Sequence, residues 1–129
     1  MRRKILAFSS AVELGTALLA MVDPALLVRL LLGADIAGIA VVLGRCFGIA
    51  LLALGLACWP GRAGDGGGLP AFRAMLVYNA LIALFLVYLS VVEHMAGVML
   101  WPAVILHAVV ALLLAWTWRG ERGAASAGG

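Results

Sequence analysis

The sequence predicts an all-α integral membrane protein, a four-helix bundle with a short interfacial helix between spans 1 and 2. Two observations predict this class. The chain of 129 residues is 66% hydrophobic and 12% charged, with a mean hydropathy of +1.17, whereas soluble domains are about 45–50% apolar and about 25% charged. Its apolar residues also form four stretches of roughly 20 residues, the length that crosses a bilayer. We therefore expect residues 1–119 to form one membrane domain with no separate soluble domain.

The first span is expected over residues 5–22, behind the basic start MRRK. A short helix is expected next, over residues 24–32. Asp23 suits its N-cap, Pro24 suits its first helical position, and Gly33 suits its C-terminal stop. Because this helix is too short to cross a membrane, we expect it to lie in the interface.

The remaining spans are expected over residues 36–59, 72–92 and 98–118. The segment PGRAGDGGGLP, which follows the second span, is rich in glycine and proline and predicts a flexible loop. Residues 120–129 are small and polar, which predicts a disordered cytoplasmic tail.

Basic residues predict the orientation of the chain. With the N-terminus inside, only Arg29 lies in an outer connection, and Arg45 lies within a span. The other basic residues all fall on the inner side: Arg2, Arg3, Lys4, Arg62, Arg73, Arg119 and Arg122. This distribution follows the positive-inside rule, so we expect both termini in the cytoplasm.

Polar side chains interrupt the apolar spans near the middle of the membrane. Glu13, Arg45, Asn79 and His107 each belong to a different span, and Tyr78 precedes Asn79. With a rise of about 1.5 Å per residue, all four helices can contribute to one layer near the midplane. Ionisable residues inside a membrane are costly and usually functional. These five residues are therefore our candidates for a binding pocket.

The charge of Arg45 needs an explanation, because a lone charge at the bilayer centre costs at least ~2.5 kcal/mol. We predict that Arg45 forms an ion pair with Glu13, which would remove much of that cost. The alternative is that its long side chain extends to the outer headgroups. A buried ion pair serves either as a structural device or as part of a ligand or proton site, and the sequence leaves both open.

Two further features concern helix packing and cofactors. Gly44 and Gly48 form a G-x-x-x-G step, which predicts close packing inside the chain or, alternatively, a homodimer seam. His107 is interpreted as a hydrogen-bonded core residue, with a haem ligand as the sharper alternative. Its obvious second ligand, His94, lies in the outer turn at a different depth, so we do not expect haem.

The sequence contains no catalytic signature: H-x-x-x-H, C-x-x-C, G-x-S-x-G and the P-loop are all missing. It therefore predicts no catalytic residue and no metal site, and it does not favour an enzyme. Nothing in it indicates nucleic-acid binding. The residues identify no cofactor, and a quinone or a lipid remains compatible with the polar layer.

The layout resembles the DoxX-like group of small bacterial four-helix membrane proteins. The resemblance is carried by DPALLVRLLLG after the first span, GRCFGIALLALGLACW in the second and FRAMLVYNALIAL at the start of the third. An R-x-x-G step and a later arginine recur in that group, here as Arg45 with Gly48, and Arg73. Some members are similar to small subunits of membrane oxidoreductases that work with quinones. The resemblance thus implies an accessory subunit in a bacterial inner membrane.

Three functions remain open from the sequence. The first is an accessory or assembly subunit of a larger membrane complex, whose partners are membrane lipids and either other membrane subunits or a second copy. The second is a stand-alone binder or carrier of a small lipid-soluble molecule such as a quinone. The third is a proton-coupled drug antiporter, because such chains also carry an acid in the first span, like Glu13 in ELGT. An arginine beside Glu13 would hold that acid ionised and oppose proton exchange.

Overall fold

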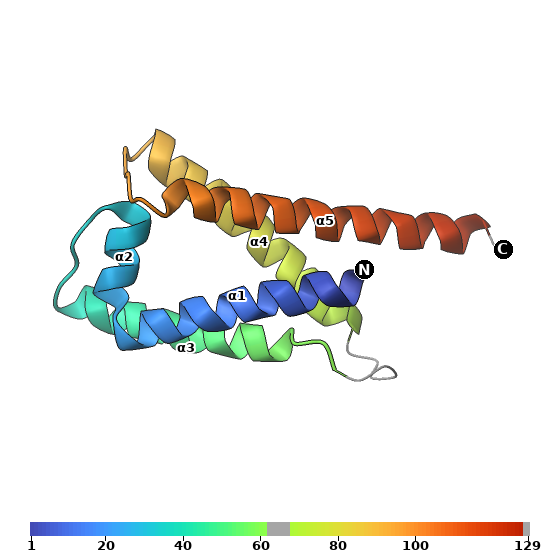
Figure 1. The fold of residues 1–129 in the computed structure, drawn as a ribbon, viewed down its shortest axis with the longest axis horizontal. Helices are drawn as coiled ribbons and strands as arrows, with labels where there is room; N and C mark the ends of the chain where they lie inside the picture. The colour runs from blue at the N-terminus through green and yellow to red at the C-terminus, as the bar shows by residue number, and fades with distance from the viewer. Residues whose placement is uncertain (62–67, 128–129) are drawn as a thin grey trace.

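The structure is a computed structural model that describes residues 1–61 and 68–127, with side chains up to residue 119. Within these ranges the chain is all helical, without a strand. The elements are α1 (Arg2–Val22), α2 (Pro24–Leu32), α3 (Ile39–Ala57), α4 (Gly68–Val91) and α5 (Leu100–Ala127). All except α2 are long and apolar enough to cross a membrane. The two termini lie at the same end of the molecule (Figure 1). The predicted fold class is confirmed.

The short helix α2 occupies the residues predicted for it. The Asp23 carboxylate accepts a hydrogen bond of 2.9 Å from the backbone N–H of Leu26, which satisfies one free donor of the first turn. At the other end, Gly33 adopts a left-handed conformation with φ of 70°, which terminates the helix.

The second and third spans begin at different residues from those predicted. α3 begins at Ile39 rather than at residue 36, because Gly38 before it has φ of 58°, outside the helical range. α4 begins at Gly68, earlier than the predicted residue 72. Pro70 lies in its first turn, where a missing backbone N–H disrupts no helical hydrogen bond. Most of the predicted loop, residues 62–67 with Arg62, lies outside the described residues.

The last helix also extends beyond its prediction. α5 begins at Leu100 and continues to Ala127, so residues 120–127 are helical in the segment for which the sequence predicts a disordered tail. This segment contains no proline and includes several alanines, which favour continuation of a helix. Residues 128–129 lie outside the described residues.

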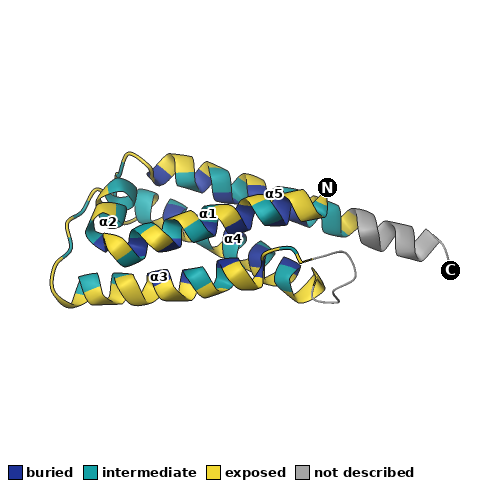
Figure 2. Cartoon of the chain, turned by 60° about the horizontal axis from the view of Figure 1, so that its bottom comes forward, coloured by how far each residue is buried: buried dark blue, intermediate teal, exposed yellow. Residues whose placement is uncertain are grey.

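The helices form two antiparallel pairs that meet through α1. α1 packs along α3, while α4 packs along α5, and α2 bridges the two pairs at the end opposite the termini (Figure 1). In their most apolar stretches, 39% of the α1 residues but only 17% of the α3 residues are buried inside the chain. Figure 2 shows the exposed residues along α3. α1 is therefore the central helix and α3 a peripheral one.

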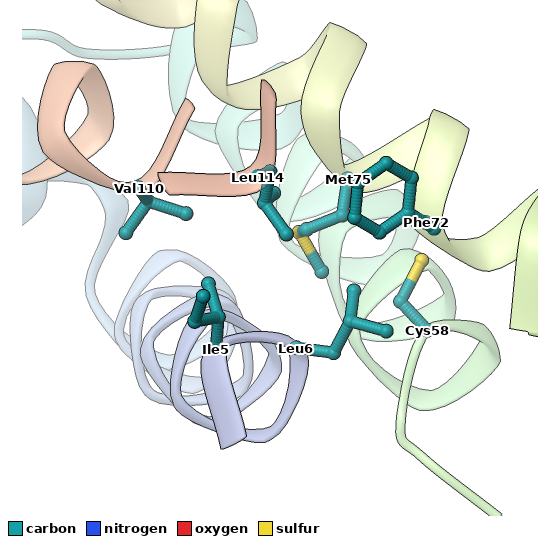
Figure 3. Packing of buried hydrophobic residues seen from close by; sticks show 7 residues of the cluster. All are labelled: Ile5, Leu6, Cys58, Phe72, Met75, Val110 and Leu114. Carbon is teal, nitrogen blue, oxygen red and sulfur yellow. The ribbon is translucent and has the colours of Figure 1, made fainter. Parts of the chain in front are cut away.

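Two apolar clusters fill the two ends of the bundle. Figure 3 shows the cluster nearer the termini, where side chains from α1, α4 and α5 meet Cys58 at the end of α3; its members are Ile5, Leu6, Cys58, Phe72, Met75, Val110 and Leu114. The other cluster consists of Leu86, Leu100 and Val104. On each of α4 and α5, a stretch of residues separates the two clusters. In α4 this stretch contains Asn79, and in α5 it contains His107, which belong to the polar layer described below.

The connector between α4 and α5, residues 92–99, is hydrogen-bonded to the C-terminal end of α2. The backbone N–H of Met99 donates to the carbonyl of Leu30 at 2.8 Å, and that of Ala96 donates to the carbonyl of Leu32 at 3.3 Å. These bonds satisfy carbonyls that a helix C-terminus leaves free. A Cβ atom on Gly97 would collide with the backbone of Leu30 and Leu31. This close approach requires glycine and holds the two helix pairs together at this end.

Gly44 and Gly48 face the first two helices of the same chain. A Cβ atom on Gly48 would lie 2.9 Å from the backbone nitrogen of Met21 and 3.0 Å from the carbonyl oxygen of Ala17. A Cβ atom on Gly44 would lie 2.6 Å from Cβ of Pro24. The small residues let α3 approach α1 closely.

Candidate functional site

A layer of buried polar side chains lies between the two apolar clusters. Its members come from α1, α4 and α5, and each is at most 9% exposed: Ser9, Ser10, Glu13, Asn79 and His107. The sequence predicted Glu13, Asn79 and His107 as site residues but not the two serines. The available signal for Ser9 was its spacing of four residues from Glu13, which places both on one face of α1.

Asn79 connects three helices. Its amide nitrogen donates to Oγ of Ser9 at 3.1 Å and to the carbonyl of Met75 at 2.8 Å. Its Oδ1 lies 2.9 Å from Nδ1 of His107. Since Oδ1 only accepts hydrogen bonds, Nδ1 of His107 carries the proton and donates. In a neutral imidazole, Nε2 is then left as an acceptor.

Glu13 is enclosed without a hydrogen bond. It is 1% exposed, and its Oε1 lies 3.8 Å from Nδ1 of His107. Neither carboxylate oxygen has a hydrogen-bond partner among the described residues, and the hydroxyl of Ser10 also has none. Leaving a buried polar group unpaired costs about 1–3 kcal/mol. The polar layer is thus incompletely satisfied on the side of α1.

Tyr78 lies beside this layer and is half-buried. Its ring meets the ring of His107 edge to face, with centroids 5.9 Å apart and an interplanar angle of 81°. Its hydroxyl lies close enough to the Glu13 carboxyl to interact with it, although neither carboxyl oxygen has a hydrogen bond of accepted geometry.

A cavity of about 280 Å³ adjoins the layer. Its polar wall residues are Thr16, Tyr78 and His107. The rest of the wall is apolar and comes mainly from α1, α2, α4 and α5, with one residue of α3: Val12, Leu19, Leu27, Leu30, Leu31, Phe47, Ile82, Leu86, Met99, Pro102, Ala103 and Leu106. Sites for small molecules have this composition, an apolar wall with a few polar groups that orient the ligand.

Arg45 does not join the other candidates. It is exposed on α3, and it forms no ion pair within the described part of the chain. The predicted pair with Glu13 is therefore wrong. The reason is geometric: Gly44 and Gly48 face the first two helices, and one residue further along a helix turns the side chain by about 100°. Of the five predicted pocket residues, the structure brings together Glu13, Tyr78, Asn79 and His107.

Comparison with protein-family models, curated proteins and solved structures finds no match to this chain. A functional assignment therefore depends on the geometry of the polar layer and the cavity.

Proposed function

We propose that this small integral membrane protein binds or carries a small lipid-soluble molecule, such as a quinone, in the cavity lined by Tyr78 and His107. The observation that carries this proposal is the pairing of a mainly apolar cavity with polar groups in one part of its wall. An apolar wall favours a ligand that reaches the site through the lipid. The polar groups give such a ligand a defined orientation.

The structure of the layer behind the wall supports the same proposal. A bundle that needed polar side chains only for packing would satisfy them internally, since buried polar groups are usually hydrogen-bonded. Here Asn79 is fully bonded, whereas Glu13 is enclosed without a hydrogen bond, 3.8 Å from the ring nitrogen of His107. Packing alone therefore does not account for the polar layer behind the cavity wall.

A pair of alanine variants tests this proposal. Ala103→Phe fills the cavity, because Ala103 lies in its wall. Ala53→Phe makes the same change on the exposed face of α3, away from the cavity. Native mass spectrometry of protein gently extracted from its own membrane measures any retained small molecule. We expect an added mass of small-molecule size on the wild type and on Ala53→Phe, but none on Ala103→Phe. Equal retention by both variants would contradict the proposal.

A second function, an accessory subunit of a larger complex, is favoured by Arg45. This arginine is exposed on the helix that is least enclosed by its own chain, with no acidic partner among the described residues. A partner helix with an acidic residue would neutralise it inside the membrane. The resemblance to the DoxX-like group implies the same role, a bacterial inner membrane with both termini in the cytoplasm, and contacts with lipids and either other subunits or a second copy.

Substitution of Arg45 tests the accessory role. Complexes are extracted mildly from native membranes, and their masses are compared for the wild type, Arg45→Gln and the control Arg3→Gln. Arg3 is an exposed arginine in the first turn of α1, away from the exposed face of α3. A partner that is lost with Arg45→Gln but kept with Arg3→Gln supports the accessory role. A chain that runs alone in all three samples argues against it.

The drug-antiporter alternative has less support. Such a protein needs an acid that meets its cationic substrate, whereas Glu13 is 1% exposed and does not contribute to the cavity wall. The sequence-based objection, an arginine close to Glu13, no longer applies, because Arg45 lies on another face of the bundle.

A further inference from the structure

We infer that the cavity selects a neutral molecule with a hydrogen-bond donor, a phenol or another ring bearing a hydroxyl, over a hydrocarbon of the same shape. This inference rests on the proposed function and names the ligand class for the same cavity. It is supported by the hydrogen bonding of His107 and Tyr78, together with the balance of hydrogen-bond donors and acceptors around these two residues.

The first step concerns the free nitrogen of His107. Its Nδ1 donates to Oδ1 of Asn79, so Nε2 of the neutral ring is an acceptor. Nε2 has no hydrogen bond within the described residues, and it is not among the fully enclosed polar atoms that lack a partner. Nε2 therefore reaches open space. The cavity is the open space that His107 lines, so its wall presents an acceptor.

The second step concerns the hydroxyl of Tyr78. It interacts with the Glu13 carboxyl without a hydrogen bond of accepted geometry, it is not fully enclosed, and Tyr78 lines the same cavity. The two rings stand edge to face with centroids 5.9 Å apart, so the two residues belong to one part of the wall. A ligand hydroxyl has a lone pair for the Tyr78 O–H and a proton for His107 Nε2. A hydrocarbon has neither, and a carbonyl oxygen has no proton to give, so within the class proposed above the cavity prefers the hydroxyl-bearing quinol form to the quinone.

The third step concerns the balance of donors and acceptors behind the wall. The enclosed atoms without partners are both carboxyl oxygens of Glu13 and the hydroxyl of Ser10. Acceptors therefore exceed donors around His107 when Glu13 is ionised, and a ligand that brings a proton reduces this excess. No charged side chain lies in the wall of this cavity among the described residues, which favours a neutral ligand over a cation.

Size narrows the class further. A volume of about 280 Å³ is at the small end for ligand pockets, which run from about 300 to 1,000 Å³. It suits a body of one or two rings. The main competing occupant is a lipid acyl chain, which cannot form hydrogen bonds with His107 or Tyr78.

The experiment compares two probes of one shape, 2-naphthol and 2-methylnaphthalene. The full-length protein in detergent is dialysed to equilibrium against each probe, with empty micelles as the blank, and the bound probe is quantified by mass spectrometry. The chain contains two tyrosines, which provide a matched pair of variants. Tyr78→Phe removes the hydroxyl from the wall, and Tyr88→Phe removes one that bonds Glu93 outside the cavity. His107→Leu removes the acceptor.

We expect the wild type to bind 2-naphthol about tenfold more tightly than 2-methylnaphthalene, the ratio that one net hydrogen bond supplies. This preference should fall in Tyr78→Phe and His107→Leu and persist in Tyr88→Phe. The conservative tyrosine variants keep the test decisive if His107→Leu fails to fold.

Three results would overturn the inference. Equal binding of both probes would show that the cavity binds apolar molecules and does not recognise their hydroxyl group. That result would contradict the ligand class but not the proposed function. If both Tyr78→Phe and His107→Leu still prefer 2-naphthol to 2-methylnaphthalene, the hydroxyl of the probe binds somewhere other than Tyr78 and His107. If the probes fail to bind, or a copurified lipid fills the cavity and resists exchange, the proposed function falls together with the ligand class.

Discussion

Oδ1 of Asn79 in α4 lies 2.9 Å from Nδ1 of His107 in α5. The amide nitrogen of the same asparagine bonds Ser9 of α1 at 3.1 Å. One side chain therefore joins three helices at the level where the bundle has no apolar cluster. Because these bonds have defined directions, they also fix how α4 and α5 are rotated relative to α1. The edge of the cavity at His107 depends on that rotation.

Asn79→Leu should destabilise the bundle. It removes the bonds to Ser9 and His107 and leaves both buried without those partners. We expect a loss of about 1–3 kcal/mol in the free energy of unfolding, measured by denaturant titration in mixed micelles. Val77→Leu, at an exposed position on the same helix, serves as the control and should change stability little. Equal stability of the two variants would mean that the Asn79 bonds contribute nothing.

Gly97→Ala should destabilise the end opposite the termini, and Gly15→Ala should not. A methyl group on Gly97 meets the backbone of Leu30 and Leu31, which cannot withdraw as a flexible side chain would. A methyl group on Gly15 would meet nothing within 4 Å beyond its own stretch of α1, and alanine is favoured over glycine inside a helix by about 1 kcal/mol. Melting temperatures in detergent should thus move in opposite directions. A common direction for both variants would contradict the close contact between α2 and the α4–α5 connector.

Local signals in the sequence were enough to predict much of the fold. The boundaries of α2 followed from Asp23, Pro24 and Gly33, each of which acts within one helical turn, and the structure has the helix at those residues. The start of α3 depends on the positive φ of Gly38. A glycine permits a positive φ but does not require it, so the sequence does not reveal this break. The start of the second span was therefore predicted at residue 36, too early in the chain.

The polar layer was harder to predict because depth along a helix does not give the direction of a side chain. Glu13 and Arg45 have opposite charges on neighbouring helices, and depth alone made them a plausible pair. The face of α3 that packs on α1 is set by Gly48, and that rotation exposes Arg45. The cavity has no local signature either, since its wall combines residues from all five helices.

Two double-mutant cycles should distinguish the observed layer from the predicted ion pair. In the structure Oε1 of Glu13 lies 3.8 Å from Nδ1 of His107, and Glu13 forms no ion pair with Arg45, which is exposed. The stability effects of Glu13→Gln and Arg45→Gln should therefore add to within about 0.5 kcal/mol. Glu13→Gln and His107→Gln should couple by more than that. Unfolding in mixed micelles gives both cycles, and a larger coupling for the Arg45 cycle would reverse the assignment.

The two cysteines should report the position of α3. Cys46 is exposed on α3, whereas Cys58 is 1% exposed and its thiol donates to the carbonyl of Ala71 at 3.4 Å. A membrane-permeant maleimide should label native protein in mild detergent at one site, and denatured protein at two, counted by intact mass. Cys46→Ser should abolish the native label, and Cys58→Ser should leave it. Equal labelling rates at both cysteines would show that the end of α3 is not packed against α1 and α4 as Figure 3 shows.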